Sequence, residues 1–97
     1  MMAKKNYNFN YMIVVYDVGE KRVGKVFKIC KKYLEHFQNS VFRGEISPSN
    51  ILKLKNELQS IIDTDYDHVT FMKFIGKHQI FEENIGKQFK TEYEDFI

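Results

Sequence analysis

The chain has 97 residues, a length that fits one domain with a single hydrophobic core and excludes a multidomain assembly. Its hydrophobic fraction of 43%, with 15% aromatic residues and one proline, excludes a disordered or collagen-like chain. The single cysteine, Cys30, excludes an intrachain disulfide. Because the sequence shows no secretion leader and no apolar stretch near the roughly 20 residues of a membrane-spanning helix, we expect a protein of the reducing cytoplasm without a membrane partner.

Charge is distributed unevenly along the chain, although the formal net charge is only +2. Residues 1–55 carry 11 basic and 4 acidic side chains, whereas residues 56–97 carry 4 basic and 9 acidic ones. Such a local excess of positive charge favours binding to a polyanion, and a chance sorting of surface charges explains it equally well. The N-terminal half is therefore a candidate nucleic-acid-binding surface.

The first two elements are a strand and a basic helix. Residues 1–10 show no periodicity, and we expect them to form a flexible N-terminal arm. The run YMIVVYD, which starts at Tyr11, is apolar on both faces, as in a central strand. The next segment, residues 20–37, predicts an amphipathic helix with a basic ridge. Its apolar side comprises Val23, Val26, Phe27, Cys30, Tyr33 and Leu34, and its basic ridge comprises Lys21, Lys25, Lys28 and Lys32.

The second half of the predicted domain repeats this alternation of strands and helices. Residues 37–46, FQNSVFRGEI, indicate either one bent strand or two short strands. Ser47 and Pro48 then form a helix start signal, and the spacing of apolar residues predicts a helix to about Asp63. HVTFMKFI predicts a last core strand that Gly76 ends, and weak alternation in HQIFEENIG predicts a short terminal strand before an acidic tail.

This order of elements fits a split β-α-β arrangement. We expect the first and last core strands to be adjacent and parallel, with both helices on one face of the sheet. Met12, Val14 and Tyr16 alternate with Ile13 and Val15, so the second face of the sheet is also apolar and needs a cover. A second copy of the chain is the simplest cover, and we therefore predict a homodimer through the sheet face.

Asp17 is the acidic residue whose position calls for an explanation, because it ends the first strand directly before a helix. In one interpretation its carboxylate caps the free N–H groups at the start of that helix. In the other it binds Mg²⁺, which is usually held in phosphate chemistry by one or two carboxylates together with water and phosphate oxygens. One carboxylate per chain is too few for such a site unless two chains bring their copies together across a two-fold axis.

Two segments in order resemble one protein family. The pair Tyr16 and Asp17 ends the run MIVVYD, and QNSVF, residues 38–42, follows after a helix rich in lysine and arginine. Together with the capped helix and the closing apolar strand, this pattern is similar to the CRISPR-associated protein 2 family over roughly residues 11–86. The sequence departs from the family pattern at His36, Phe37 and Asn39. These departures argue against strong nuclease activity more than they argue against the family's fold.

The resemblance implies an α+β fold, a ferredoxin-like βαββαβ sandwich over residues 11–78. It also implies an additional C-terminal strand, which lies with the acidic tail in residues 79–97. These C-terminal residues are expected to serve dimer or partner contacts. The same resemblance implies a homodimer with Mg²⁺ bound between the two copies of Asp17, the catalytic and metal-binding residue. The nucleic-acid-binding residues it implies are Tyr16, Lys21, Arg22, Lys25 and Arg43. Ser40 and Phe42 are expected near the dimer seam.

The function that the resemblance implies is CRISPR spacer acquisition. In that role the homodimer binds duplex prespacer DNA as a scaffold for the CRISPR-associated protein 1 integrase, and it has at most weak Mg²⁺-dependent endonuclease activity on RNA or DNA. The alternative is a toxin-type endoribonuclease that resembles virulence-associated protein D. An RNA-recognition module is set aside because neither VFRGEI nor FMKFIG supplies its aromatic strand pattern. The three histidines show no metal-ligand spacing and receive no role.

Overall fold

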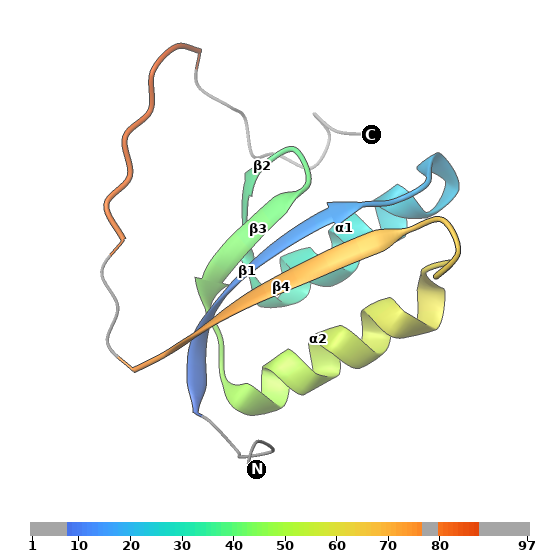
Figure 1. Cartoon of the computed structure of the whole chain (residues 1–97), viewed down its shortest axis with the longest axis horizontal. Helices are drawn as coiled ribbons and strands as arrows, with labels where there is room; N and C mark the ends of the chain where they lie inside the picture. Colours follow the sequence, from blue (N-terminus) through green and yellow to red (C-terminus); the bar gives the residue numbers. More distant parts are fainter. Residues whose placement is uncertain (1–7, 77–79, 88–97) are drawn as a thin grey trace.

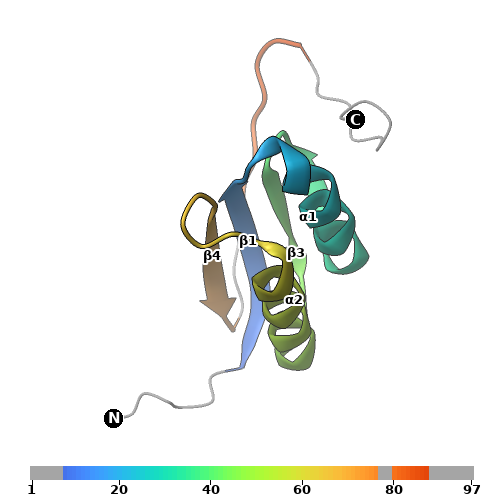
Figure 2. The same cartoon turned by 90° about the vertical axis from the view of Figure 1, so that its right-hand side faces the viewer.

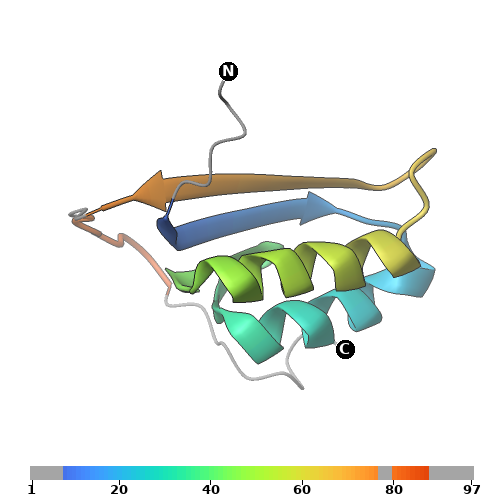
Figure 3. The ribbon, with the colours of Figure 1, turned by 90° about the horizontal axis from the view of Figure 1, so that it is seen from below.

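The computed structural model describes residues 8–76 and 80–87. Its elements in chain order are β1 (Phe9–Asp17), α1 (Glu20–Tyr33), β2 (Glu35–Gln38), β3 (Val41–Glu45), α2 (Pro48–Ile61) and β4 (His68–Ile75). The strands form one sheet in the order β2-β3-β1-β4. Both helices pack on the same face of this sheet, so the molecule has two layers (Figures 1 to 3). The predicted ferredoxin-like α+β fold is confirmed.

The neighbouring strands are antiparallel throughout, which corrects the prediction that the first and last core strands run parallel. β1 and β4 are adjacent as predicted, with Asp17 opposite His68 and Val14 opposite Phe71. The hairpin between β2 and β3 explains the direction, because it reverses the chain before α2 returns it to the start of β4. β4 therefore runs parallel to β3 and opposite to β1.

Three boundaries also differ from the sequence-based expectations. β1 begins at Phe9, two residues before the predicted start, and α1 ends at Tyr33 instead of continuing to residue 37. Residues 35–38 form β2, so the segment FQNSVFRGEI belongs to two strands and not to one bent strand. Asn39, with a positive φ of 39°, lies in the tight turn that joins them, where asparagine tolerates the left-handed region.

The C-terminal predictions have separate outcomes. Residues 80–87 form no strand in this chain, so the predicted terminal strand is wrong for the single copy over that range. Its side chains Phe81 and Ile85 are 88% and 99% exposed, an unusual position for large apolar groups. The acidic tail and most of the N-terminal arm lie outside the described residues, and the predictions for them stay predictions.

The core lies between the sheet and the two helices. Phe42 of β3, which is fully buried, packs its ring against those of Phe27, His36 and Tyr16. α1 and α2 contribute their predicted apolar sides, and the buried members include Val26, Phe27, Cys30, Leu34, Ile51, Leu54 and Leu58. Ser47 caps α2 as predicted, because its Oγ accepts the N–H of Asn50 at 3.2 Å. Burial raises the pKa of the Cys30 thiol to about 12, so this cysteine is an inert core residue.

Candidate metal and nucleic-acid site

Asp17 ends β1 with an exposed side chain on the sheet face that the helices leave open. Met12, Val14 and Tyr16 alternate with it and are buried. Figure 2 shows that both helices cover one face of the sheet and leave the other face open. Its carboxylate makes no hydrogen bond or ion pair with any residue that the structure describes. The N-cap of α1 is Gly19, and the helix start has no side-chain cap bond. The capping interpretation of Asp17 is therefore wrong, and the carboxylate is available to a ligand.

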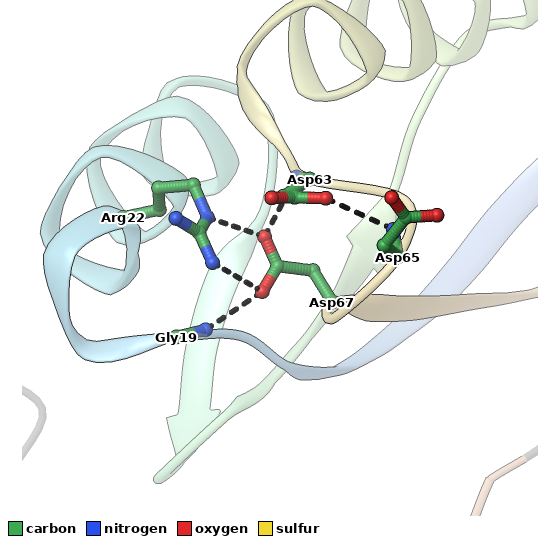
Figure 4. A network of polar contacts seen from close by, with 5 residues as sticks. All are labelled: Gly19, Arg22, Asp63, Asp65 and Asp67. Carbon is green, nitrogen blue, oxygen red and sulfur yellow. Dashed lines mark hydrogen bonds and ion pairs between the residues drawn. The ribbon is translucent and has the colours of Figure 1, made fainter.

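A buried carboxylate that the sequence analysis missed fixes the loop after Asp17. The carboxylate of Asp67, directly before β4, accepts two hydrogen bonds from the guanidinium of Arg22 (Figure 4). Nε donates one at 2.5 Å and Nη2 donates the other at 2.9 Å. It also accepts the N–H groups of Gly19 and Asp63, each at 2.8 Å. The Asp67 side chain is completely buried. We call these four residues, Gly19, Arg22, Asp63 and Asp67, the Asp67 latch, because they tie the β1–α1 loop to the α2–β4 turn.

The latch explains why residue 19 is a glycine. A Cβ built at Gly19 would lie 2.6 Å from Nη2 of Arg22, too close for the guanidinium to keep its place on Asp67. A sequence pattern gives no sign of this contact, because Arg22 and Asp67 are 45 residues apart. Asp67 also looks like one more acid of the turn DTDYD.

The latch predicts a specific pH dependence of stability. The Arg22 guanidinium and two backbone N–H groups hold the pKa of Asp67 well below its ordinary value of about 3.9. A depressed carboxylate pKa stabilises the fold above the unfolded-state pKa, and this stabilisation is lost as the pH falls toward the folded-state pKa. We expect Asp67→Asn to have a lower urea midpoint than wild type at pH 7, and the difference to shrink below about pH 4.

Urea titrations of both proteins between pH 7 and pH 3 measure this difference. Asp65→Asn removes an exposed acid of the same turn and serves as the control, with a midpoint near that of wild type. A difference between Asp67→Asn and wild type that stays constant down to pH 3 would contradict the assignment of the depressed pKa to Asp67.

The residues predicted to bind nucleic acid do not form one surface. Lys21 and Lys25 are exposed on the outer side of α1, as predicted, and Lys21 lies in the first turn of the helix. The Arg22 guanidinium is instead held by Asp67, so we no longer assign it to phosphate binding. The Arg43 guanidinium lies over the ring of Phe37, 4.0 Å from the ring centroid, and forms an ion pair with Glu82 at 2.5 Å. The charge of Arg43 is therefore also engaged within the chain.

Two of the predicted site residues lie in the core of the single chain. Tyr16 is 5% exposed and its ring stacks on Phe42 at 6.3 Å. Phe42 is fully buried, on the sheet face that the helices cover. The residue types gave no means of separating the two faces of β1, because both of its faces are apolar. Ser40 lies in the β2–β3 turn, where its carbonyl accepts the N–H of Tyr16 at 3.1 Å.

The single chain offers only part of a metal site. Among residues 8–76 and 80–87, no group of three or more His, Cys, Asp or Glu side chains could hold a metal ion. The exposed, unpaired carboxylate of Asp17 nevertheless fits one ligand of such a site, and a symmetric second copy would supply another. No helix in the described part of the chain is long and apolar enough to span a membrane.

The fold and the exposed acid at the end of β1 define a ferredoxin-like α+β protein with an open sheet face. The family model for CRISPR associated protein Cas2 matches residues 10–82. The chain therefore belongs to the CRISPR-associated Cas2 family.

Individual relatives agree with this assignment. The CRISPR-associated endoribonuclease Cas2 of Thermotoga maritima is 54% identical over 61 residues, which cover 63% of this chain and 70% of the relative. The protein of the same name from Methanosarcina acetivorans is 37% identical over 76 residues, covering 78% of this chain and 87% of the relative. A crystal structure of Cas2 is similar with a TM-score of 0.73 and 38% identity, covering 87% of this chain and 93% of the other. A hypothetical protein from Thermus thermophilus, TT1823, has a TM-score of 0.66 at 21% identity over 77% of this chain and 93% of its own, and it shares the fold.

Proposed function

We propose that this protein acts in CRISPR spacer acquisition as a homodimer that binds duplex DNA and hydrolyses phosphodiester bonds slowly with a divalent cation at Asp17. The observation that carries the proposal is the unpaired Asp17 carboxylate on an uncovered apolar sheet face. Membership of the Cas2 family supports the biological setting. The relatives named endoribonucleases support phosphodiester chemistry and make RNA the alternative substrate.

The open sheet face supports the homodimer. Its large apolar side chains include Val15 and Met72, which are 36% and 43% exposed. Tyr11 and Phe74 add an edge-to-face pair with ring centroids 5.7 Å apart. A contiguous apolar face of this kind is usually covered by a partner, and a two-fold copy would place Asp17 opposite its counterpart. The exposed apolar side chains of residues 80–87 support our expectation that this segment joins the partner's sheet as an added strand.

Within the proposed site, each residue of the chain has a limited task. Asp17 would hold the cation, which when bound polarises a phosphodiester and lowers the pKa of a water molecule. Lys21 and Lys25 would neutralise phosphates nearby without reading bases. We expect slow catalysis, because the described residues of one chain form no group of three or more metal-ligating side chains.

The proposed partner is the CRISPR-associated protein 1 integrase, for which the dimer would hold prespacer DNA. A pull-down with that integrase tests the partnership. The dimer itself is tested by sedimentation at micromolar concentration. A species near the chain mass of 11.6 kDa would contradict it.

The lysines of α1 give a measurable prediction. Replacing Lys21 and Lys25 together by alanine should weaken binding to duplex DNA and make the slope of log affinity against log salt shallower by about 2, because each phosphate contact contributes about 0.9. Fluorescence anisotropy at several salt concentrations measures the slope. Replacing Lys53 and Lys55 of α2 is the matched control for the loss of two charges. An unchanged slope in the Lys21 and Lys25 variant would rule out these two residues as phosphate contacts.

A further inference from the structure

His68 lies directly across from Asp17 in the sheet. The two residues are register partners at the ends of β4 and β1, and both side chains are exposed. Directly opposite residues of an antiparallel pair lie on the same face, with Cβ atoms about 4.5 to 5.5 Å apart. This places an imidazole beside the unpaired carboxylate, on the face where we propose the second copy.

A contact within β4 orients the His68 ring. Thr70 lies two residues further along the strand, on the same face, and its Oγ1 is 3.4 Å from Nδ1 of His68. When the Nδ1–H group donates to this oxygen, Nε2 keeps its lone pair. Metal-binding histidines are commonly fixed in this way, with one ring nitrogen donating a hydrogen bond and the other facing the metal.

The Asp67 latch fixes the spacing between the two strand ends. Asp67 precedes His68, and Gly19 is two residues after Asp17. The 2.8 Å hydrogen bond from the Gly19 N–H to the Asp67 carboxylate therefore links the backbone just after Asp17 to the side chain just before His68 (Figure 4). With the Arg22 guanidinium on the same carboxylate, the β1 and β4 ends cannot separate without breaking a partly buried ion pair. A pair of ligands on such a rigid frame needs little reorganisation to bind an ion.

From this arrangement we infer that His68 and Asp17 together form the metal-ligand pair of each chain. The inference rests on the proposed metal role of Asp17 and goes further, because it names a second ligand and the class of ion. Two copies across a two-fold axis would supply two carboxylates and two imidazoles. Magnesium prefers oxygen ligands and keeps its water, whereas imidazole suits iron, nickel, copper and zinc. The site should therefore prefer these transition metals to Mg²⁺, the cofactor that the family resemblance implies.

Binding of Mn²⁺ to the full chain, without nucleic acid, tests this assignment. Electron paramagnetic resonance counts free Mn²⁺ during a titration, and electron spin echo modulation detects a ¹⁴N nucleus bound to the ion. We expect ¹⁴N modulation in wild type and its loss in His68→Ala. Because even the outer-shell partners of metal ligands contribute about 10- to 100-fold to affinity, His68→Ala should lower Mn²⁺ affinity at least about tenfold. In a competition titration with Mg²⁺, His68→Ala should lower Mg²⁺ affinity less than it lowers Mn²⁺ affinity.

Three variants separate the outcomes. His78→Ala removes another histidine of the chain and should keep the ¹⁴N modulation, and His68→Gln should repeat the loss seen with alanine. If Asp17→Asn loses Mn²⁺ while His68→Ala keeps both affinity and modulation, the His68 assignment is overturned and the Asp17 site stands. If wild type binds no Mn²⁺, or Asp17→Asn binds it as wild type does, the proposed metal site and the inference both fail.

Discussion

Asp17→Asn is expected to lower any divalent-cation-dependent cleavage of RNA or DNA by at least about a hundredfold, because a bound cation contributes several kcal/mol of transition-state stabilisation. The amide keeps the size of the side chain but is a poor metal ligand. Asp17 is exposed and caps no helix, so the variant should unfold at the same urea concentration as wild type and remain a dimer. It should also still support spacer integration with the integrase, because scaffolding does not need the carboxylate.

Cleavage assays with purified wild type, Asp17→Asn and Asp65→Asn measure this effect. Asp65 is an exposed acid outside the proposed site, so its variant controls for the loss of one negative charge. Cleavage by Asp17→Asn at the wild-type rate would remove the metal-site assignment. A contaminating nuclease would produce that same result, and a matched purification of both variants identifies it.

Phe42→Ala is expected to destabilise the fold by about 3 to 5 kcal/mol, the usual loss for a large aromatic side chain removed from a core. Phe42 is fully buried, and its ring lies 5.2 Å from that of Phe27 and 4.9 Å from that of His36. Such a loss is a large fraction of the total stability of a small domain. Urea denaturation followed by circular dichroism measures it.

Val41→Ala is the control for Phe42→Ala, because Val41 is the neighbouring residue of β3 on the opposite, open face. We expect the Val41 variant to lose less stability in the single chain. A Phe42→Ala protein that keeps wild-type stability but sediments as a monomer would contradict the core assignment and restore Phe42 to the dimer seam.

Local sequence signals predicted most of the fold. The apolar side of α1, the Ser47–Pro48 start of α2 and the strand HVTFMKFI all appear where periodicity and capping place them. The end of α1 was missed because Leu34 continues the helical spacing of apolar residues, although its backbone is already extended. Strand direction depends on the hairpin at Asn39, a tertiary property that the order of elements does not determine.

The site was predicted less completely than the fold. Asp17 could be found because a strand-ending acid before a helix is unusual, and the resemblance gave it a role. Asp67 could not be found, since its partners Gly19 and Arg22 are distant in sequence and become neighbours through the pairing of β1 with β4. The same pairing places His68 beside Asp17, and no spacing rule for metal ligands covers residues 51 positions apart.

In the proposed dimer, two copies of this chain share a metal site built on Asp17. Native mass spectrometry of the full chain with Mn²⁺ tests it most directly, because the measured mass gives the number of chains and the number of bound ions together. We expect a wild-type dimer that holds one Mn²⁺ and a dimer of Asp17→Asn that holds none. A monomer, or one ion in each separate chain, would contradict the shared site.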